Sequence, residues 1–239
     1  FFLSFFSFSF SFSSSSFFFI KLNVGAVASG SCCKPTSCAM FSETTGTIVI
    51  GGRKLFMFDA QALAQAESPV IDLCYNSVSM TILGACGNGV KVWNASTGVL
   101  INEFSNLTPS NITQLTLDGR QRKFIVGDSM GNVKCFNVLN GAFMGSILLQ
   151  SHRKAISSLF YGNEDRIIVT SSWDRTINVY HDAPPLEGEN PYLKNRTLLR
   201  TIDDAHTSDI TCTAVSRRLS LIATGDTNGW YVKIEKIII

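Results

Sequence analysis

One pentapeptide of this 239-residue chain has the residue types and spacing of a hydrolytic site. Residues 127–131 read Gly-Asp-Ser-Met-Gly, the G-x-S-x-G pattern in which a strained turn between a strand and a helix exposes a serine nucleophile. That chemistry needs a histidine base within reach of Ser129 and a helix after the turn. Residues 132–136 have instead the composition of a strand, so we expect Ser129 to lie in a hairpin turn. A serine hydrolase built on this turn is the alternative to a non-catalytic protein.

The residue types that bind metals are dispersed along the chain. None of the three histidines, His152, His181 and His206, lies at metal-ligand spacing from a cysteine or a carboxylate. Three of the seven cysteines cluster in residues 32–38, but their spacing does not match a zinc site. The odd number of cysteines is atypical of a disulfide framework and favours a reducing compartment. We therefore predict neither a metal nor a cofactor.

The composition indicates a folded protein without a strong electrostatic field. Hydrophobic residues make up 45% of the chain and charged residues 16%, which is not the composition of a disordered protein. The 20 Lys and Arg residues exceed the 18 Asp and Glu residues by only two, so the formal net charge is +2. A chain so nearly neutral is not expected to bind nucleic acid or an anionic membrane surface.

The first twenty residues differ from the rest of the chain. Residues 1–20 hold ten of the 18 Phe residues and eight Ser residues, and no charged residue. Serine interrupts this leader too often for a secretory signal or a membrane span, and no Met precedes Met40. Because Phe and Ser share pyrimidine-rich codons, we interpret the leader as a translated pyrimidine tract that is not part of the fold. A genuine leader would instead make a secreted or membrane-anchored protein the alternative.

Short strand-like runs recur after the leader with a regular period. Each run ends in an aromatic residue followed by a polar one. The aromatic positions Phe58, Trp93, Phe136 and Tyr180 are 35, 43 and 44 residues apart, and Ile234 stands in the corresponding place 54 residues later. The mean step of 44 residues is typical of a four-stranded propeller blade. We predict repeats at about 22–69, 70–106, 111–149, 151–204 and 205–239.

The copies also share an inner order. Each begins with an apolar strand and a polar turn, and continues with a second strand that ends in small residues. A third strand carries the aromatic residue, and a variable fourth strand follows in most copies. Small residues suit a tight hairpin between the second and third strands. No stretch has a helical period, so the predicted class is all-β.

These copies resemble the WD40 (Trp-Asp) repeat family. The best match is residues 172–180, preceded at the family's distance by Ser151 and His152, with Tyr180-His181 in place of Trp-Asp. The resemblance implies a partial WD40-like β-propeller, with four full blades and three strands of a fifth. An open array leaves strand edges exposed, so we interpret the chain as a fragment of a larger propeller. After Gly229 we expect the sequence to depart from the repeat by read-through.

The resemblance also implies a buried polar network in each blade, made by a loop His, a hydroxyl, a turn Asp and the aromatic residue. Only the fourth copy supplies nearly the whole set, which is His152, Thr170 or Ser172, Asp174 and Tyr180. In the other copies the Asp position falls near Gly52 and on Gly87, Met130 and Asn228. We therefore expect packing to hold those blades together.

The function implied by the resemblance is a non-catalytic scaffold for other proteins. In the fourth copy, the loop before the first strand and the turn between the second and third strands are expected on one face, which brings together Trp173, Arg175, Arg153 and Lys154. An exposed Trp flanked by Arg is typical of an interface hot spot. The alternative is that Trp173 packs over neighbouring loops. The loop sequences also resemble WD-repeat proteins of ciliated and flagellated cells, which implies the cytoplasm, a cilium or the cytoskeleton. We expect no membrane contact unless the leader is genuine.

Two other surface segments are predicted to be ordinary solvated loops. One is the turn that holds Arg120, Arg122 and Lys123, and the other is residues 183–196, which hold three of the six prolines.

Overall fold

The computed structural model describes residues 17–20, 38–42, 47–51, 54–58, 63–65, 69–147, 152–182, 197–216 and 219–235. Side chains are described only within the ranges 69–147, 152–182, 198–216 and 219–234. All regular elements within the described ranges are β-strands. Among these residues there is no helix of the length and apolar character that a membrane crossing needs.

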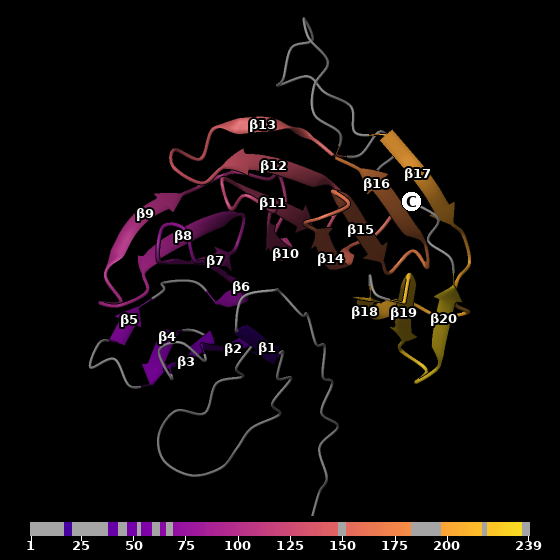
Figure 1. The fold of residues 1–239 in the computed structure, drawn as a ribbon, viewed down its shortest axis with the longest axis horizontal. Helices are drawn as coiled ribbons and strands as arrows, with labels where there is room; N and C mark the ends of the chain where they lie inside the picture. The colour runs from indigo at the N-terminus through magenta and orange to yellow at the C-terminus, as the bar shows by residue number, and fades with distance from the viewer. Residues whose placement is uncertain are drawn as a thin grey trace, which may run out of the picture. The chain divides into compact units, whose positions relative to one another are not determined.

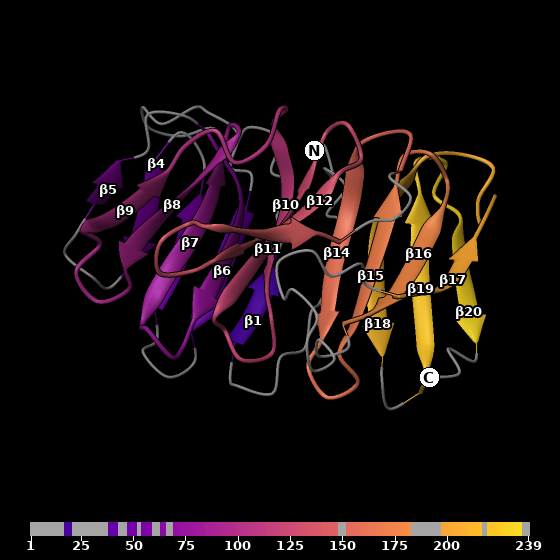
Figure 2. The same ribbon diagram turned by 90° about the horizontal axis from the view of Figure 1, so that it is seen from above.

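The strands form five antiparallel sheets, and each sheet follows chain order (Figures 1 and 2). The chain divides into two compact units, Phe1–Asn106 and Leu107–Ile239. The first unit holds one sheet of β1 (Phe17–Ile20), β2 (Cys38–Ser42), β3 (Thr47–Gly51), β4 (Lys54–Phe58) and β5 (Leu63–Gln65). Its second sheet consists of β6 (Val70–Asn76), β7 (Thr81–Cys86), β8 (Gly89–Asn94) and β9 (Leu100–Phe104).

The second unit holds three sheets. The first consists of β10 (Ile112–Leu117), β11 (Lys123–Asp128), β12 (Val133–Asn137) and β13 (Phe143–Ser146). The next consists of β14 (Ile156–Gly162), β15 (Ile167–Ser172), β16 (Ile177–His181) and β17 (Thr197–Ile202). The last consists of β18 (Ile210–Ser216), β19 (Leu221–Asp226) and β20 (Tyr231–Glu235).

The end of the leader belongs to the first sheet. β1 pairs antiparallel with β2, with Phe17 opposite Ser42 and Ile20 opposite Ala39. Four of the residues that we assigned to the leader are therefore paired with a strand of this sheet. Residues 1–16 of the leader lie outside the described residues.

The segment after Gly229 forms the third strand of the last sheet. β20 pairs with β19 and places Ile234 opposite Ile222, just as Tyr180 lies opposite Ile168 in the preceding sheet. The expected departure from the repeat is therefore not seen in β20, since an isoleucine takes the place of the aromatic residue and packs partly buried against the core.

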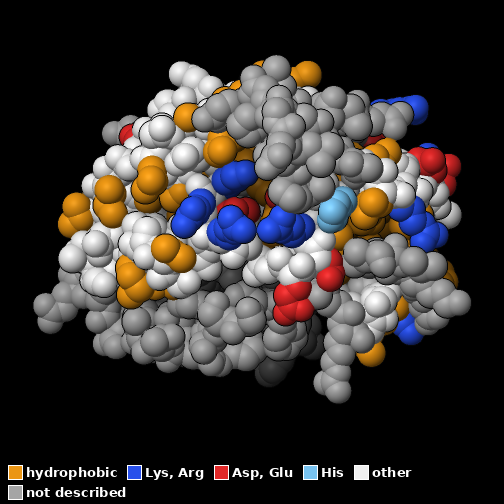
Figure 3. Space-filling view, turned by 45° about the horizontal axis from the view of Figure 1, so that its top comes forward, with side chains coloured by type: hydrophobic (Ala, Val, Ile, Leu, Met, Phe, Trp, Pro, Cys, Tyr) orange, Lys and Arg blue, Asp and Glu red, His pale blue; other side chains and the backbone are white. Residues whose placement is uncertain are grey.

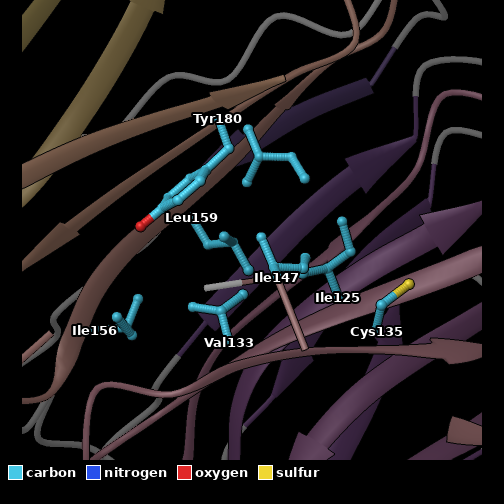
Figure 4. Packing of buried hydrophobic residues seen from close by; sticks show 8 residues of the cluster. Ile125, Val133, Cys135, Ile147, Ile156, Leu159 and Tyr180 are labelled. Atoms are coloured by element: carbon cyan, nitrogen blue, oxygen red, sulfur yellow. The ribbon is translucent and has the colours of Figure 1, made fainter. Parts of the chain in front are cut away.

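The core of the second unit lies between successive sheets. The first strands β10, β14 and β18 are neighbours across the sheets, and Figure 1 shows β13 and β17 on the outside of the unit. One cluster fills the space between two sheets (Figure 4); its members are Ile125, Val133, Cys135, Ile147, Ile156, Leu159, Ile168 and Tyr180. This stacking of antiparallel sheets confirms the predicted fold class, an all-β partial propeller.

Candidate partner-binding face

The hairpin turns between the second and third strands of the three sheets in the second unit define the candidate face. In these three turns the third residue after the second strand has a positive φ, in the left-handed region. That residue is Gly131 in the first sheet, with φ of 85°, and Gly229 in the last, with φ of 81°. In the middle sheet it is Arg175, with φ of 71°. A side chain there costs about 1 kcal/mol, so Arg175 is an outlier among the three turns.

Ser129 of the G-x-S-x-G pattern lies in the first of these turns, as expected. Its N–H donates to the carbonyl of Asn111 at 2.9 Å, and the strand β12 follows the turn. The backbone of His152 is close, because its N–H donates to the carbonyl of Gly131 at 3.2 Å. Both ring nitrogens of His152 are nevertheless engaged elsewhere. Within the described residues, Ser129 therefore has neither the helix nor the base of a hydrolase.

The side chain of His152 is buried at the centre of a polar network. Its Nε2 lies 2.8 Å from the hydroxyl of Thr170, and its Nδ1 lies 2.8 Å from the hydroxyl of Thr176. Thr176 donates in turn to Asp174 Oδ1 at 2.7 Å, so the network assigns the proton of the ring to Nδ1. The structure thus brings together His152, Thr170 and Asp174, which the sequence had grouped.

Asp174 holds the turn together as an anion. Burial favours the neutral acid, but hydrogen bonds from His152, Thr176 and two backbone N–H groups outweigh that effect and hold the pKa of Asp174 well below its usual range. One of those N–H groups belongs to Arg153, at 2.7 Å from Oδ2. The carboxylate therefore joins the loop before β14 to the turn after β15.

Two other predicted members of the network have different partners. The hydroxyl of Ser172 donates to the carbonyl of Lys154 at 3.0 Å and does not contact His152, so Thr170 is the hydroxyl of this site. Tyr180 is fully buried in the apolar cluster. Burial raises the pKa of Tyr180 to about 12, with a hydrogen bond to Asn178 acting in the opposite direction.

A second network of the same kind lies in the last sheet, where the sequence predicted packing alone. His206 places Nε2 at 2.7 Å from the hydroxyl of Thr224 and Nδ1 at 3.2 Å from Asp226 Oδ2. The carboxylate also accepts the N–H groups of Asn228 and Trp230, both at 2.9 Å. The sequence analysis placed the turn carboxylate of this blade at Asn228, and that position was wrong. The shared spacing of 18 residues from His to Thr was the signal that could have found the network.

The carboxylate of this network stands two residues before the expected position, at Asp226 rather than Asn228. Asp128 has the same place in the first sheet of the unit, two residues before Met130. It is fully buried and accepts the N–H groups of Met130 and Asn132, at 3.0 and 2.9 Å. Asp128 and Asp226 are the last residues of β11 and β19, and from there each carboxylate accepts N–H groups of the turn that follows. Packing alone therefore does not hold this blade, contrary to the prediction.

The surface residues predicted to bind a partner divide into two groups. Trp173 is 49% exposed, and Arg153 is exposed beside it, since the N–H of Trp173 donates to the carbonyl of Ala155 at 3.1 Å. Lys154 and Arg175 have acidic partners from the next loop. Lys154 Nζ lies 3.1 Å from Asp209, and Arg175 Nη2 lies 3.0 Å from Asp204.

Two exposed side chains on these turns were not among the predicted residues. Met130 is 62% exposed in the first turn and Trp230 is 70% exposed in the last. The turns are linked through the loops between them, because Thr227 donates its N–H to the carbonyl of Asp209 at 3.0 Å. Each of the three turns therefore presents a large apolar side chain next to a loop that carries charge.

The remaining candidates are the basic turn between β10 and β11, the loop 183–196 and the cysteines of residues 32–38. Arg120 and Arg122 are exposed and Lys123 is half-buried in the turn between β10 and β11. Lys and Arg side chains gather on the face that Figure 3 shows, with acidic side chains nearby, as on a solvated surface. No group of His, Cys, Asp and Glu side chains suited to a metal occurs in the described part of the chain. The loop 183–196 and the side chains of the cysteines in residues 32–38 lie outside that part.

Comparisons with known proteins agree with this geometry. Residues 145–181 match the WD40 family described as "WD domain, G-beta repeat". Over 112 residues, 47% of the chain, the sequence is 32% identical to Cilia- and flagella-associated protein 337 B of Tetrahymena thermophila, of whose length the match covers 9%. Over 179 residues, 75% of the chain, it is 22% identical to WD repeat-containing protein 3 of Homo sapiens, of which 17% is covered. The chain thus spans less than a fifth of either relative.

Solved structures show the same fold. The computationally designed protein Ika8 superposes with a TM-score of 0.63 at 17% identity, over 96% of this chain and 70% of that one. The designed protein Ika4 gives a TM-score of 0.55 at 21% identity, over 71% of this chain and 92% of that one.

Proposed function

We propose that this chain, in which residues 145–181 match a WD40 repeat, is a non-catalytic scaffold that binds other proteins through the turns of its second unit. Repeated sheets hold many loops at fixed positions, which suits a large contact surface. The observation that carries the proposal is the turn 173–175. It presents an exposed tryptophan beside an arginine whose backbone is left-handed, where the sister turns have glycine.

The polar networks make this surface rigid. In the middle sheet Asp174 bonds the turn to the loop at Arg153, and in the last sheet Asp226 bonds the turn that ends at Trp230. An anchor held by such a network loses little conformational freedom on binding, so more of the contact energy remains as affinity. The same turns lack the parts of a hydrolase around Ser129, which supports the non-catalytic assignment.

The assembly that the scaffold serves is proposed to be ciliary or flagellar. The support is the relative whose name is Cilia- and flagella-associated protein 337 B, which is 32% identical over nearly half of the chain. The proposed location is accordingly the cilium or the cytoskeleton within the cytoplasm, and the proposed partners are proteins rather than nucleic acid.

The test is proximity labelling in ciliated cells with the tagged chain. We expect labelled axonemal proteins, and a loss of most of them when Trp173→Ala and Arg175→Ala are combined. Leu139→Ala is the matched control, because Leu139 is 79% exposed in the turn between β12 and β13, at the other end of the strands. Circular dichroism shows whether each variant is folded. Unchanged labelling by the folded double variant would mean that this face does not bind the partners.

A further inference from the structure

We propose that Asn228, in the last hairpin turn, is a site of spontaneous chemical modification. The backbone nitrogen of Gly229 attacks the side-chain amide of Asn228, and water then converts the product into aspartate or isoaspartate. Isoaspartate lengthens the main chain by one atom inside the turn that presents Trp230. This modification goes beyond the proposed function and does not depend on it.

The reaction is an internal substitution followed by hydrolysis. The nitrogen of Gly229 forms a bond to Cγ of Asn228 and loses its proton, while the bond from Cγ to Nδ2 breaks and ammonia leaves. A cyclic imide remains, and water opens it. Addition of water at Cγ gives aspartate, whereas addition at the main-chain carbonyl carbon gives isoaspartate, in which the chain runs through the former side chain. Asparagine is a labile residue, and glycine favours ring closure because it has no Cβ to hinder the approach.

The side chains of the asparagines separate this site from similar ones. The chain has three Asn-Gly pairs, which begin at Asn88, Asn140 and Asn228 and lie within the described residues. Asn88 Nδ2 donates to Asn106 Oδ1 at 3.0 Å, and Asn140 Oδ1 accepts the N–H of Ala142 at 3.0 Å. Asn228 is exposed, and the hydrogen bond that it makes in the described part of the chain comes from its backbone N–H. Its side-chain amide can therefore turn towards the next nitrogen.

The glycines of the three pairs also differ in their surroundings. A Cβ added to Gly89 would lie 2.4 Å from the carbonyl oxygen of Phe104, so the backbone there is closely packed. Gly229 is exposed, and a Cβ added to it would meet nothing within 4 Å. The N–H of Gly229 donates to the carbonyl of Asp226 at 3.2 Å, a longer bond than the 2.9 Å bond that the N–H of Gly141 makes. The last pair is therefore the one with both an open backbone and an open side chain.

Isoaspartate at this position disrupts the polar network of the last sheet. Asp226 Oδ1 accepts the N–H groups of Asn228 and Trp230, both at 2.9 Å, and the carbonyl of Asp226 accepts that of Gly229. These N–H groups lie on both sides of the lengthened link, so Asp226 cannot keep all of them. We expect the turn to open and Trp230 to lose its fixed position. Aspartate would leave the main chain unchanged and add only an exposed charge.

The test is incubation of the folded chain at mildly alkaline pH, followed by trypsin digestion and mass spectrometry. The three pairs fall in separate tryptic peptides, residues 55–91, 135–153 and 219–233. Transfer of a labelled methyl group by an isoaspartate methyltransferase identifies the isoaspartate product. We expect the modified fraction to rise first in 219–233. In a chain unfolded in urea the three rates should converge, because every Asn-Gly pair is then exposed.

Asn228→Gln is the blocking variant. It keeps the amide and the glycine, but its longer side chain must close a larger ring, which forms far more slowly. We expect this variant to lose the modification of peptide 219–233. Asn140→Gln makes the same change at another Asn-Gly pair, and it should leave the modification of 219–233 as it is in the natural chain.

Hydrogen exchange tests the effect on the turn. Chains that carry isoaspartate should lose protection in 219–233, whereas Asn228→Asp has the added charge with the natural main chain and should keep its protection. Equal modification of the three peptides in the folded chain would overturn the site. Equal loss of protection in Asn228→Asp would overturn the role of the lengthened main chain. Neither outcome decides the proposed scaffold, which is tested separately through Trp173 and Arg175.

Discussion

Trp93 has surroundings that differ from those of the equivalent residue in the middle sheet of the second unit, Tyr180. It is fully buried in β8, at the place of Tyr180 in the third-strand series, and its indole N–H has no acceptor in the part of the chain that the structure describes. The position that Thr170 holds in the middle sheet is here Gly84, against which the indole ring packs closely. A buried donor without a partner costs about 1–3 kcal/mol.

We therefore expect Trp93→Phe to be nearly neutral, within about 1 kcal/mol. The smaller ring leaves a cavity, but it also removes the unpaired donor. Trp93→Ala leaves a far larger cavity and should cost about 3–5 kcal/mol. Urea unfolding of the two variants measures the difference. A cost for Trp93→Phe close to that for Trp93→Ala would show that the N–H has an acceptor.

At the same scale, the sequence predicted only part of the polar network and of the surface contacts. His152, Thr170 and Asp174 were found because the family resemblance fixes their spacing within one repeat. The partners of Lys154 and Arg175 were missed, since Asp209 and Asp204 belong to the next repeat and only the packing of the sheets brings them near. Thr176 was missed although it lies only two residues after Asp174, to whose carboxylate it donates.

At the scale of the elements, the hairpin turns allow a direct comparison of two glycines in equivalent positions. Gly131 and Gly229 have the same place and nearly the same φ, but different surroundings. A Cβ added to Gly131 would lie 2.2 Å from the backbone carbonyl oxygen of His152, whereas one added to Gly229 would meet nothing within 4 Å.

We expect Gly229→Ala to cost about 1 kcal/mol, the strain of a left-handed alanine. Gly131→Ala should cost more than about 3 kcal/mol, because a backbone must also move. The free energies of unfolding of the two variants in urea measure this contrast. Equal costs would mean that the loop at His152 does not lie against the turn.

The pattern of elements was the most predictable part of the fold. The period and the small residues at the ends of the second strands located the sheets and their hairpins. The turn carboxylates were misplaced in two repeats, because they are the last residues of the second strands, Asp128 and Asp226, and not the turn residues Met130 and Asn228. Only the register of the hairpin decides between them. The pairing of β1 could not be predicted, because its four apolar residues follow a run of four serines.

At the scale of the whole molecule, the two His networks predict how the protein responds to acid. Both belong to the second unit, and the pKa values of Asp174 and Asp226 lie below their usual range. A carboxylate with a lowered folded-state pKa stabilises the protein above its unfolded pKa of about 4, and this contribution is lost as pH falls below that value towards the folded pKa. The second unit should therefore lose stability from about pH 4 downwards.

The measurement is urea unfolding of the chain at pH 7, 5, 4 and 3, beside the variant Asp174→Asn with Asp226→Asn. Neither amide titrates, so the variant should be less stable than the natural chain at pH 7, and the difference should shrink as the pH falls. Hydrogen exchange assigns the loss, because peptides from β14–β20 should lose protection while those from β6–β9 keep it. A difference that stays constant down to pH 3 would mean that the two carboxylates do not have lowered pKa values in the folded state. The networks would then stabilise the turns equally with ionised and with protonated carboxylates, and the rigidity proposed for the binding face would not depend on charge.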